Sequence, residues 1–205
     1  MRKPGSMHGL EELGRVRLSV NFYMRDCLYS EIASFYGIPN IPEDPDLAIE
    51  VGSRLCEELL EPLQATFGRI AIRSAYRAAL VTKFGNERGE GASVKSNSAY
   101  HVWDRPDENG FKGAAACIVI PWFADRYAGG ADWRAIAWLV HDHLTYSHME
   151  FYPKLCALNL QWHEKPVRRI DSFITPRGCL TKPEMQNHEE DHSIWYQDFP
   201  VLAAP

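Results

Sequence analysis

The chain has 205 residues, of which 45% are hydrophobic and 24% are charged, and its formal net charge is −5. This length predicts one domain, and the composition is that of an ordinary globular protein. The negative charge disfavours a nucleic-acid partner, because neutralising phosphates needs a concentrated Lys/Arg surface and none is visible in the sequence.

The first half of the chain predicts two helices. Residues 21–36 predict a short helix with three apolar residues on one face, namely Leu28, Ile32 and Phe35. Apolar residues then recur every four positions from Leu47 to Leu63, which predicts an amphipathic helix over residues 44–68. Pro62 is expected to kink this helix or to mark its last turn, because proline removes one helical hydrogen bond.

Strands are predicted on both sides of a polar loop. Residues 69–77 (RIAIRSAYR) predict a short strand, and the Gly, Ser and Asn residues of 85–98 predict a loop. Residues 114–121 predict a buried strand that carries Ala115, Cys117 and Val119 on one face.

The second half predicts a helix, two further strands and a tail. Residues 130–143 predict an amphipathic helix. In residues 154–164, alternation places Cys156, Leu158, Leu160 and Trp162 on a core face, and Asn159, Gln161 and His163 on a polar face. Residues 167–173 predict a strand paired antiparallel to it. Residues 174–205 predict an extension that packs on the core, because it contains Ile194, Trp195, Tyr196 and Phe199.

The compartment follows from the cysteines and from the hydropathy. The five cysteines are odd in number, widely spaced and without a C-x-x-C pair, which indicates reduced thiols. No apolar run of 18 residues predicts a membrane span, and the first residues lack the apolar stretch of a signal peptide. We therefore expect a cytoplasmic protein with no membrane partner.

The order of these elements resembles the zinc D-Ala-D-Ala peptidase family, which shares its fold with Hedgehog signalling domains. The resemblance rests on NFYMRDCLYSEIASFYGIPN, on RIAIRSAYR, on a Ser-rich approach to His101, on the step from Gly113 to Cys117, and on Trp162–His163. It covers residues 20–173. It implies an α+β fold with a small antiparallel sheet and flanking helices, as one domain over residues 1–205 with residues 174–205 as a C-terminal extension.

The resemblance also implies one divalent metal ion, with zinc the expected one, held by His101, Cys117 and His163. Cys117 stands where the family has aspartate, and about nine extra residues separate His101 from Gly113. Imidazole and thiolate both bind Zn²⁺, and three protein ligands leave a fourth position for water or substrate. A thiolate ligand also makes iron or copper possible.

Other residues compete for these roles. Asp104, Asp107 and Glu108 are rival ligands in the loop after His101. His141 and His143 lie two residues apart on a predicted helix, so they cannot both face one metal, and they are equally explained as a helix end rich in histidine. Exposed tail positions are the simpler interpretation of His188 and His192.

The resemblance favours a hydrolase of an amide or peptide bond in a small-molecule or short peptide substrate. Glu150 is the candidate base and His148 lies beside it, although Glu164 is another nearby acid. Arg77 is the candidate for holding a substrate carboxylate or an oxyanion, and a strand-end salt bridge is its alternative role. Two alternative functions stay open: a metalloenzyme of the same fold turned to other small-molecule chemistry, redox chemistry included, and a metal-binding relative without catalysis.

Overall fold

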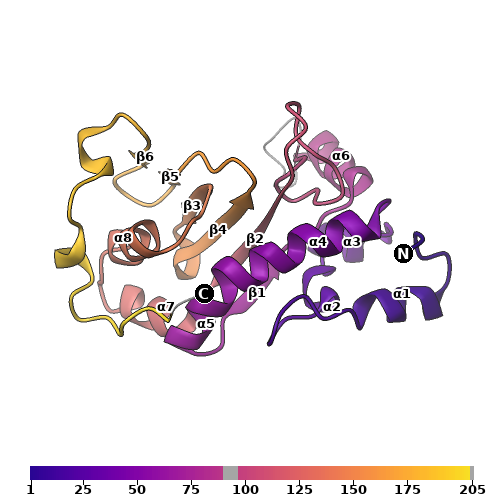
Figure 1. The fold of residues 1–205 in the computed structure, drawn as a ribbon, viewed down its shortest axis with the longest axis horizontal. Coiled ribbons are helices and arrows are strands. Elements are labelled where there is room, and N and C mark those ends of the chain that lie inside the picture. The colour runs from indigo at the N-terminus through magenta and orange to yellow at the C-terminus, as the bar shows by residue number, and fades with distance from the viewer. Residues whose placement is uncertain (90–96, 204–205) are drawn as a thin grey trace.

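The computed structural model describes residues 1–89 and 97–203, and it is an α+β fold built on one open, six-stranded sheet (Figure 1). The strands lie in the order β1-β2-β4-β3-β5-β6. Every neighbouring pair is antiparallel except β3 and β5, which are parallel. The strands are β1 (Ala71–Ser74), β2 (Gly113–Val119), β3 (His148–Tyr152), β4 (Ala157–His163), β5 (Arg169–Ser172) and β6 (Gly178–Thr181).

Eight α-helices of the described chain flank this sheet. They are α1 (Met7–Gly14), α2 (Met24–Cys27), α3 (Glu31–Tyr36), α4 (Pro45–Leu55), α5 (Glu61–Phe67), α6 (Ala79–Arg88), α7 (Pro121–Ala128) and α8 (Arg134–His143). Helix α4 starts where the sequence predicts, because the Asp44 side chain accepts a hydrogen bond from Leu47 N at 3.1 Å and Pro45 is the first helical residue.

The core lies between the helices and one face of the sheet. On this face β2 and β4 carry Ala116, Ile118, Leu158 and Leu160, all of which are buried. Helix α4 contributes Val51 and Leu55, and helix α8 contributes Ile136 and Val140. The alternation predicted for β2 and β4 is confirmed, because their apolar residues enter this core and the residues between them point to the other face.

The pairing predicted for residues 167–173 is wrong. Strand β5 does not pair with β4; it runs parallel to β3, with His148 opposite Arg169 and Glu150 opposite Asp171. The sequence interpretation had no strand at β3. Since β3 occupies the edge of β4, that edge is closed to β5.

Three helical predictions also need correction. Residues 21–36 form two helices, α2 and α3, and Phe35 is 83% exposed, so it is not on a buried face. Between α4 and α5 the chain forms a π-helix, Cys56–Leu60, and Pro62, which cannot donate a backbone hydrogen bond, follows in the first turn of α5. Part of the predicted loop 85–98 is the end of α6, and its residues 90–96 lie outside the described residues.

The extension after Ile174 runs along α8 and α7 towards α5 (Figure 1). Its Phe199 ring lies 5.1 Å from the Trp122 ring and 6.1 Å from the Phe67 ring, and Ala203 N donates to Thr66 Oγ1 at 2.8 Å. No helix among residues 1–89 and 97–203 is long and apolar enough to cross a membrane.

Candidate functional site

A row of polar side chains crosses the sheet on the face opposite the core. The register pairs Cys117 of β2 with Asn159 of β4, Asn159 with Glu150 of β3, and Glu150 with Asp171 of β5. Residues paired directly across strands point to the same face, with Cβ atoms about 5 Å apart. This row, Cys117–Asn159–Glu150–Asp171, is the centre of the candidate site.

A loop that precedes β2 is fixed against this face. Gln161 Nε2 donates to Ala99 O at 2.7 Å, Ala115 N donates to Tyr100 O at 2.7 Å, and Trp103 Nε1 donates to Ala115 O at 3.1 Å. The loop backbone can come this close to β2 because residue 113 is glycine: a Cβ at this position would lie 2.4 Å from Ala99 O. The loop therefore holds Tyr100 and His101 beside the row.

His101 is buried and its tautomer is set by the backbone. Its Nδ1 lies 2.8 Å from Ala75 O, and a carbonyl can only accept, so Nδ1 carries the proton and Nε2 keeps its lone pair. Burial, and then the charge of Arg77, lower the pKa of His101 from 6.5 to about 4, although the contacts with Ala75 and Asn159 act to raise it. His101 is therefore a neutral imidazole at physiological pH.

Arg77 is half-buried and lacks a partner among the described residues. Its backbone N donates to His101 O at 2.7 Å, but its guanidinium makes no hydrogen bond or ion pair in the described chain. Burial lowers the pKa of Arg77, whereas Cys117, Tyr152 and Glu31 act to raise it. The alternative role as a strand-end salt bridge is therefore not seen in the described chain, and this cation is available to an anionic ligand.

Cys117 is a neutral thiol in this setting. Burial raises the pKa of Cys117, although the charges of Arg73 and Arg77 act in the opposite direction. An unligated thiolate is thus not the resting state, and the thiol is poorly suited to be a nucleophile.

The Glu150 carboxylate is held in place by two donors. Its Oε2 accepts a hydrogen bond from the Tyr152 hydroxyl and another from Asn159 Nδ2 at 3.1 Å. Asn159 Nδ2 also donates to the Tyr152 oxygen at 3.0 Å. Glu150 is half-buried, so it is a fixed carboxylate that a small ligand could contact.

A second acid–base pair lies two residues along the same strand. His148 Nε2 is 2.9 Å from Asp171 Oδ2, and Asp171 also binds Arg169. Burial acts to raise the pKa of Asp171, but the hydrogen bonds from Arg169 and His148 outweigh it and lower this pKa. Asp171 is therefore a carboxylate that orients His148 and favours its Nε2 proton.

The three predicted metal ligands do not lie around one point. Cys117 is opposite Asn159, whereas His163 is opposite Gly113, so four residues of strand, roughly 13 Å, separate the two positions. The His163 ring contacts Lys165 through Nδ1 and lies 3.4 Å from Asp107 through Nε2. Ligands of one zinc ion each lie about 2 Å from it, so this set does not fit a single metal ion.

The three rival metal ligands in the loop after His101 do not form a metal site either, because two of them accept hydrogen bonds and the third is exposed. Asp104 Oδ2 accepts hydrogen bonds from Glu43 N and the Tyr76 hydroxyl, and Asp107 Oδ1 accepts two backbone hydrogen bonds within its own turn. Glu108 is exposed. Within residues 1–89 and 97–203, no group of three or more His, Cys, Asp and Glu side chains is arranged to hold a metal ion.

The remaining histidines connect the extension to α8. His141 contacts the Tyr146 hydroxyl at 2.7 Å and His188 O at 2.9 Å. His192 stacks on Trp138 with ring centroids 3.7 Å apart, and its Nδ1 lies 2.8 Å from Asp142 Oδ1. His188 and His192 are buried, so the interpretation of them as exposed tail residues is wrong.

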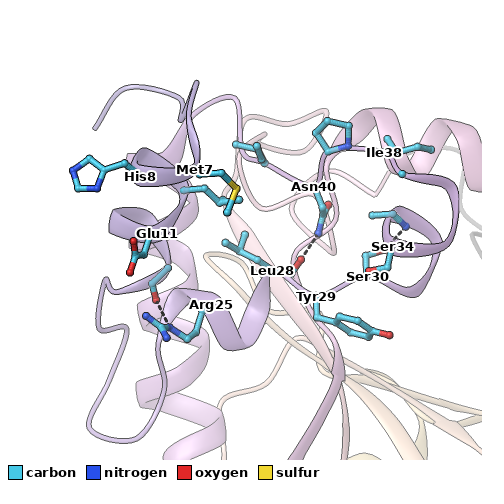
Figure 2. Close-up of a pocket in the computed structure, with 16 residues that line it drawn as sticks. Met7, His8, Glu11, Arg25, Leu28, Tyr29, Ser30, Ser34, Ile38 and Asn40 are labelled. Carbon is cyan, nitrogen blue, oxygen red and sulfur yellow. Dashed lines mark hydrogen bonds between the residues drawn. The ribbon is translucent and has the colours of Figure 1, made fainter.

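A large groove elsewhere on the described chain contains no residue of the row. This groove, of about 900 Å³, lies between α1 and α3, with mostly apolar walls that include Leu28 and Ile38 (Figure 2). Two of its polar side chains serve the fold: Asn40 donates to Leu28 O and Tyr76 O, and Arg25 Nε donates to Gly14 O at 3.2 Å. His8 of the groove is exposed and pairs with the exposed Glu12 on the same helix at 3.2 Å, so the groove has no half-buried acid–base pair like His148 and Asp171. We therefore place the candidate site at the row.

Comparison of the chain with protein-family models, with curated proteins and with solved structures finds no match. The resemblance to zinc D-Ala-D-Ala peptidases therefore stays a prediction from the sequence, and function has to be argued from the residues of the candidate site.

The neutral state of His101 predicts a loss of stability in acid. The pKa of His101 is lower in the folded chain than in the unfolded chain. The contribution of the neutral imidazole to the free energy of unfolding is therefore complete above pH 6.5 and is lost as pH falls towards 4. Over that window we expect the free energy of unfolding to fall by about 3 kcal/mol because of this group. Urea unfolding at pH 7, 5.5 and 4 measures it, and His101→Gln should show a shallower pH dependence than the wild type. Equal pH dependence in both proteins would contradict a lowered pKa of His101 in the folded chain.

Proposed function

We propose that the protein binds a small substrate with a free carboxylate on the polar face of its sheet, and hydrolyses the amide bond next to that carboxylate. The observation that carries the proposal is the half-buried Arg77 guanidinium, which has no anionic partner among the described residues. Desolvating a cation without a partner costs free energy even when the group is half-buried, and a carboxylate is the group whose geometry a guanidinium matches best. A short peptide with a free C-terminus is the simplest substrate of this kind.

The side chains around Arg77 suit amide hydrolysis. Glu150 accepts a proton from water while the water oxygen forms a bond to the amide carbon and the C=O electron pair moves to the oxygen. When the tetrahedral intermediate collapses, the C–N bond breaks and Glu150 returns the proton to the leaving amine. His148, oriented by Asp171 at 2.9 Å, is the other base on this face. We assign no step to a metal ion, because Cys117 and His163 are too far apart to share one.

A second candidate function is carboxylate binding without catalysis. The separation of Cys117 from His163 favours it, since the zinc-dependent reaction of the resembling family needs its three ligands together. The two candidates share Arg77 as the anchor and differ only in whether the amide bond is broken.

Arg77→Gln tests the anchor. We expect wild-type protein to bind an N-acetyl dipeptide with a free carboxylate at least tenfold more tightly than the same dipeptide as its C-terminal amide, because the amide removes the charge that Arg77 pairs with. In Arg77→Gln this preference should disappear. Calorimetric titration measures binding, and chromatography of the mixture measures release of the free amino acid.

The control is Arg54→Gln, which removes an exposed guanidinium paired only with Glu58 on the same helical stretch and should leave both readouts unchanged. Equal binding of the acid and amide forms by the wild type would reject the proposal. The test uses dipeptides of both chiralities. If the wild type binds them but releases no free amino acid, the second candidate function, binding without catalysis, is the one supported.

A further inference from the structure

Tyr100 places a hydroxyl group in the candidate site without a partner in the described chain. The hydroxyl oxygen is buried and makes no hydrogen bond with any described residue. The ring lies near two histidines, 4.9 Å from the His101 ring centroid and 6.2 Å from that of His148. A buried hydroxyl without a partner is unfavourable, and most buried polar groups in folded proteins do have one.

The surroundings of this hydroxyl leave it a donor. Burial, and then the negative charge of Glu150, raise the pKa of Tyr100, so the hydroxyl stays protonated. Asn159, as a hydrogen-bond donor, acts to lower this pKa, but an amide N–H can only donate, so Asn159 does not give the Tyr100 O–H group an acceptor in this way. The hydroxyl is thus an O–H group on the Glu150 side of the site, without a fixed acceptor among the described residues.

We infer that the Tyr100 hydroxyl donates a hydrogen bond to the carbonyl oxygen of the amide bond that is hydrolysed. This inference rests on the proposed function: Arg77 anchors the substrate carboxylate, Glu150 activates water, and Tyr100 binds the oxygen on which negative charge develops. Since a donor aimed at a developing oxyanion stabilises the transition state more than the substrate, its main effect is on the rate of the chemical step.

Tyr100→Phe removes only this hydroxyl. We expect hydrolysis of the N-acetyl dipeptide to slow by about 100-fold and its binding to weaken by roughly two- to tenfold. The urea midpoint of the free protein should be equal to or above that of the wild type, because the variant removes a buried polar atom that has no partner. A residue with only a structural role would lower this midpoint.

Tyr76→Phe is the matched control. Its hydroxyl is also buried, but it donates to Asp104 Oδ2 at 3.2 Å, so its removal should lower the urea midpoint and leave hydrolysis unchanged.

The inference is overturned if Tyr100→Phe lowers the midpoint as Tyr76→Phe does, or if it leaves the hydrolysis rate unchanged. Failure of the proposed function looks different: the wild type would then release no product or would not prefer the acid form. In a wild type that binds but does not hydrolyse, unchanged binding by Tyr100→Phe would overturn the inference on its own.

Discussion

Trp103→Ala is expected to lower the free energy of unfolding by about 4 kcal/mol, in the range for removing a large buried aromatic side chain. The indole is fully buried, and its Nε1 donates to Ala115 O at 3.1 Å. It lies against the backbone of α4 so closely that a Cβ on Gly52 would be 2.8 Å from its Cζ3 atom. Removing the ring leaves a cavity between the loop and α4 and an unpaired carbonyl on β2. Urea unfolding measures the loss.

Trp195→Ala is the matched control, because this indole is 37% exposed and its ring contact is with the Arg134 guanidinium at 4.4 Å. Its removal should cost less than about 1 kcal/mol. Similar losses for the two tryptophans would show that Trp103 is not the side chain that fixes the loop to the core.

Gly113→Ala should be the most damaging small substitution, with a loss of about 3 kcal/mol in the free energy of unfolding. Its Cβ would lie 2.4 Å from Ala99 O and 2.7 Å from His163 Cδ2. The imidazole can move aside, but the carbonyl belongs to the loop backbone that Gln161 holds at 2.7 Å. The loop must therefore shift, and Tyr100 and His101 shift with it, so dipeptide binding should weaken as well as stability.

Gly9→Ala provides the control for Gly113→Ala. Gly9 lies in α1, and its added Cβ would meet only atoms of Ser6 and Pro4, at ordinary distances of 3.5 Å or more. In a helix alanine is favoured over glycine by about 1 kcal/mol, so this variant should be as stable as the wild type or slightly more stable. A Gly113→Ala protein with wild-type stability and binding would refute the close packing of the loop on β2.

Local patterns predicted the elements whose period is visible in the sequence. Strand β4 alternates over seven residues and α4 has apolar residues at every fourth position, so both were predicted with the correct buried face. Strand β3 was missed because its alternation spans only five residues and ends at Pro153. Helix α6 was missed because Gly85 and Asn86 are typical of loops. The partner of β5 depends on which strand edges are free, and no local pattern contains that information.

The same limit applies to the candidate site. Sequence reasoning placed His163 on the polar face of one strand and Cys117 on one face of a buried strand. The register that puts Asn159, and not His163, opposite Cys117 is a property of the whole sheet. Sequence reasoning also missed Tyr100, Tyr152 and Asp171. For Tyr152 the signal was present, because it follows His148 and Glu150 at the period of two that places side chains on one face.

The row of side chains across β2, β4, β3 and β5 has a consequence for how such a protein could diversify. Each strand contributes one residue of the row, and each of these residues faces away from the core. Exchanging a single side chain can therefore change the chemistry of the site without repacking the interior. Adding or deleting one residue within β4 would instead turn Asn159 inwards and an apolar neighbour outwards. Related chains with altered specificity should accordingly differ by substitutions in these strands, and by length only in the connections between them.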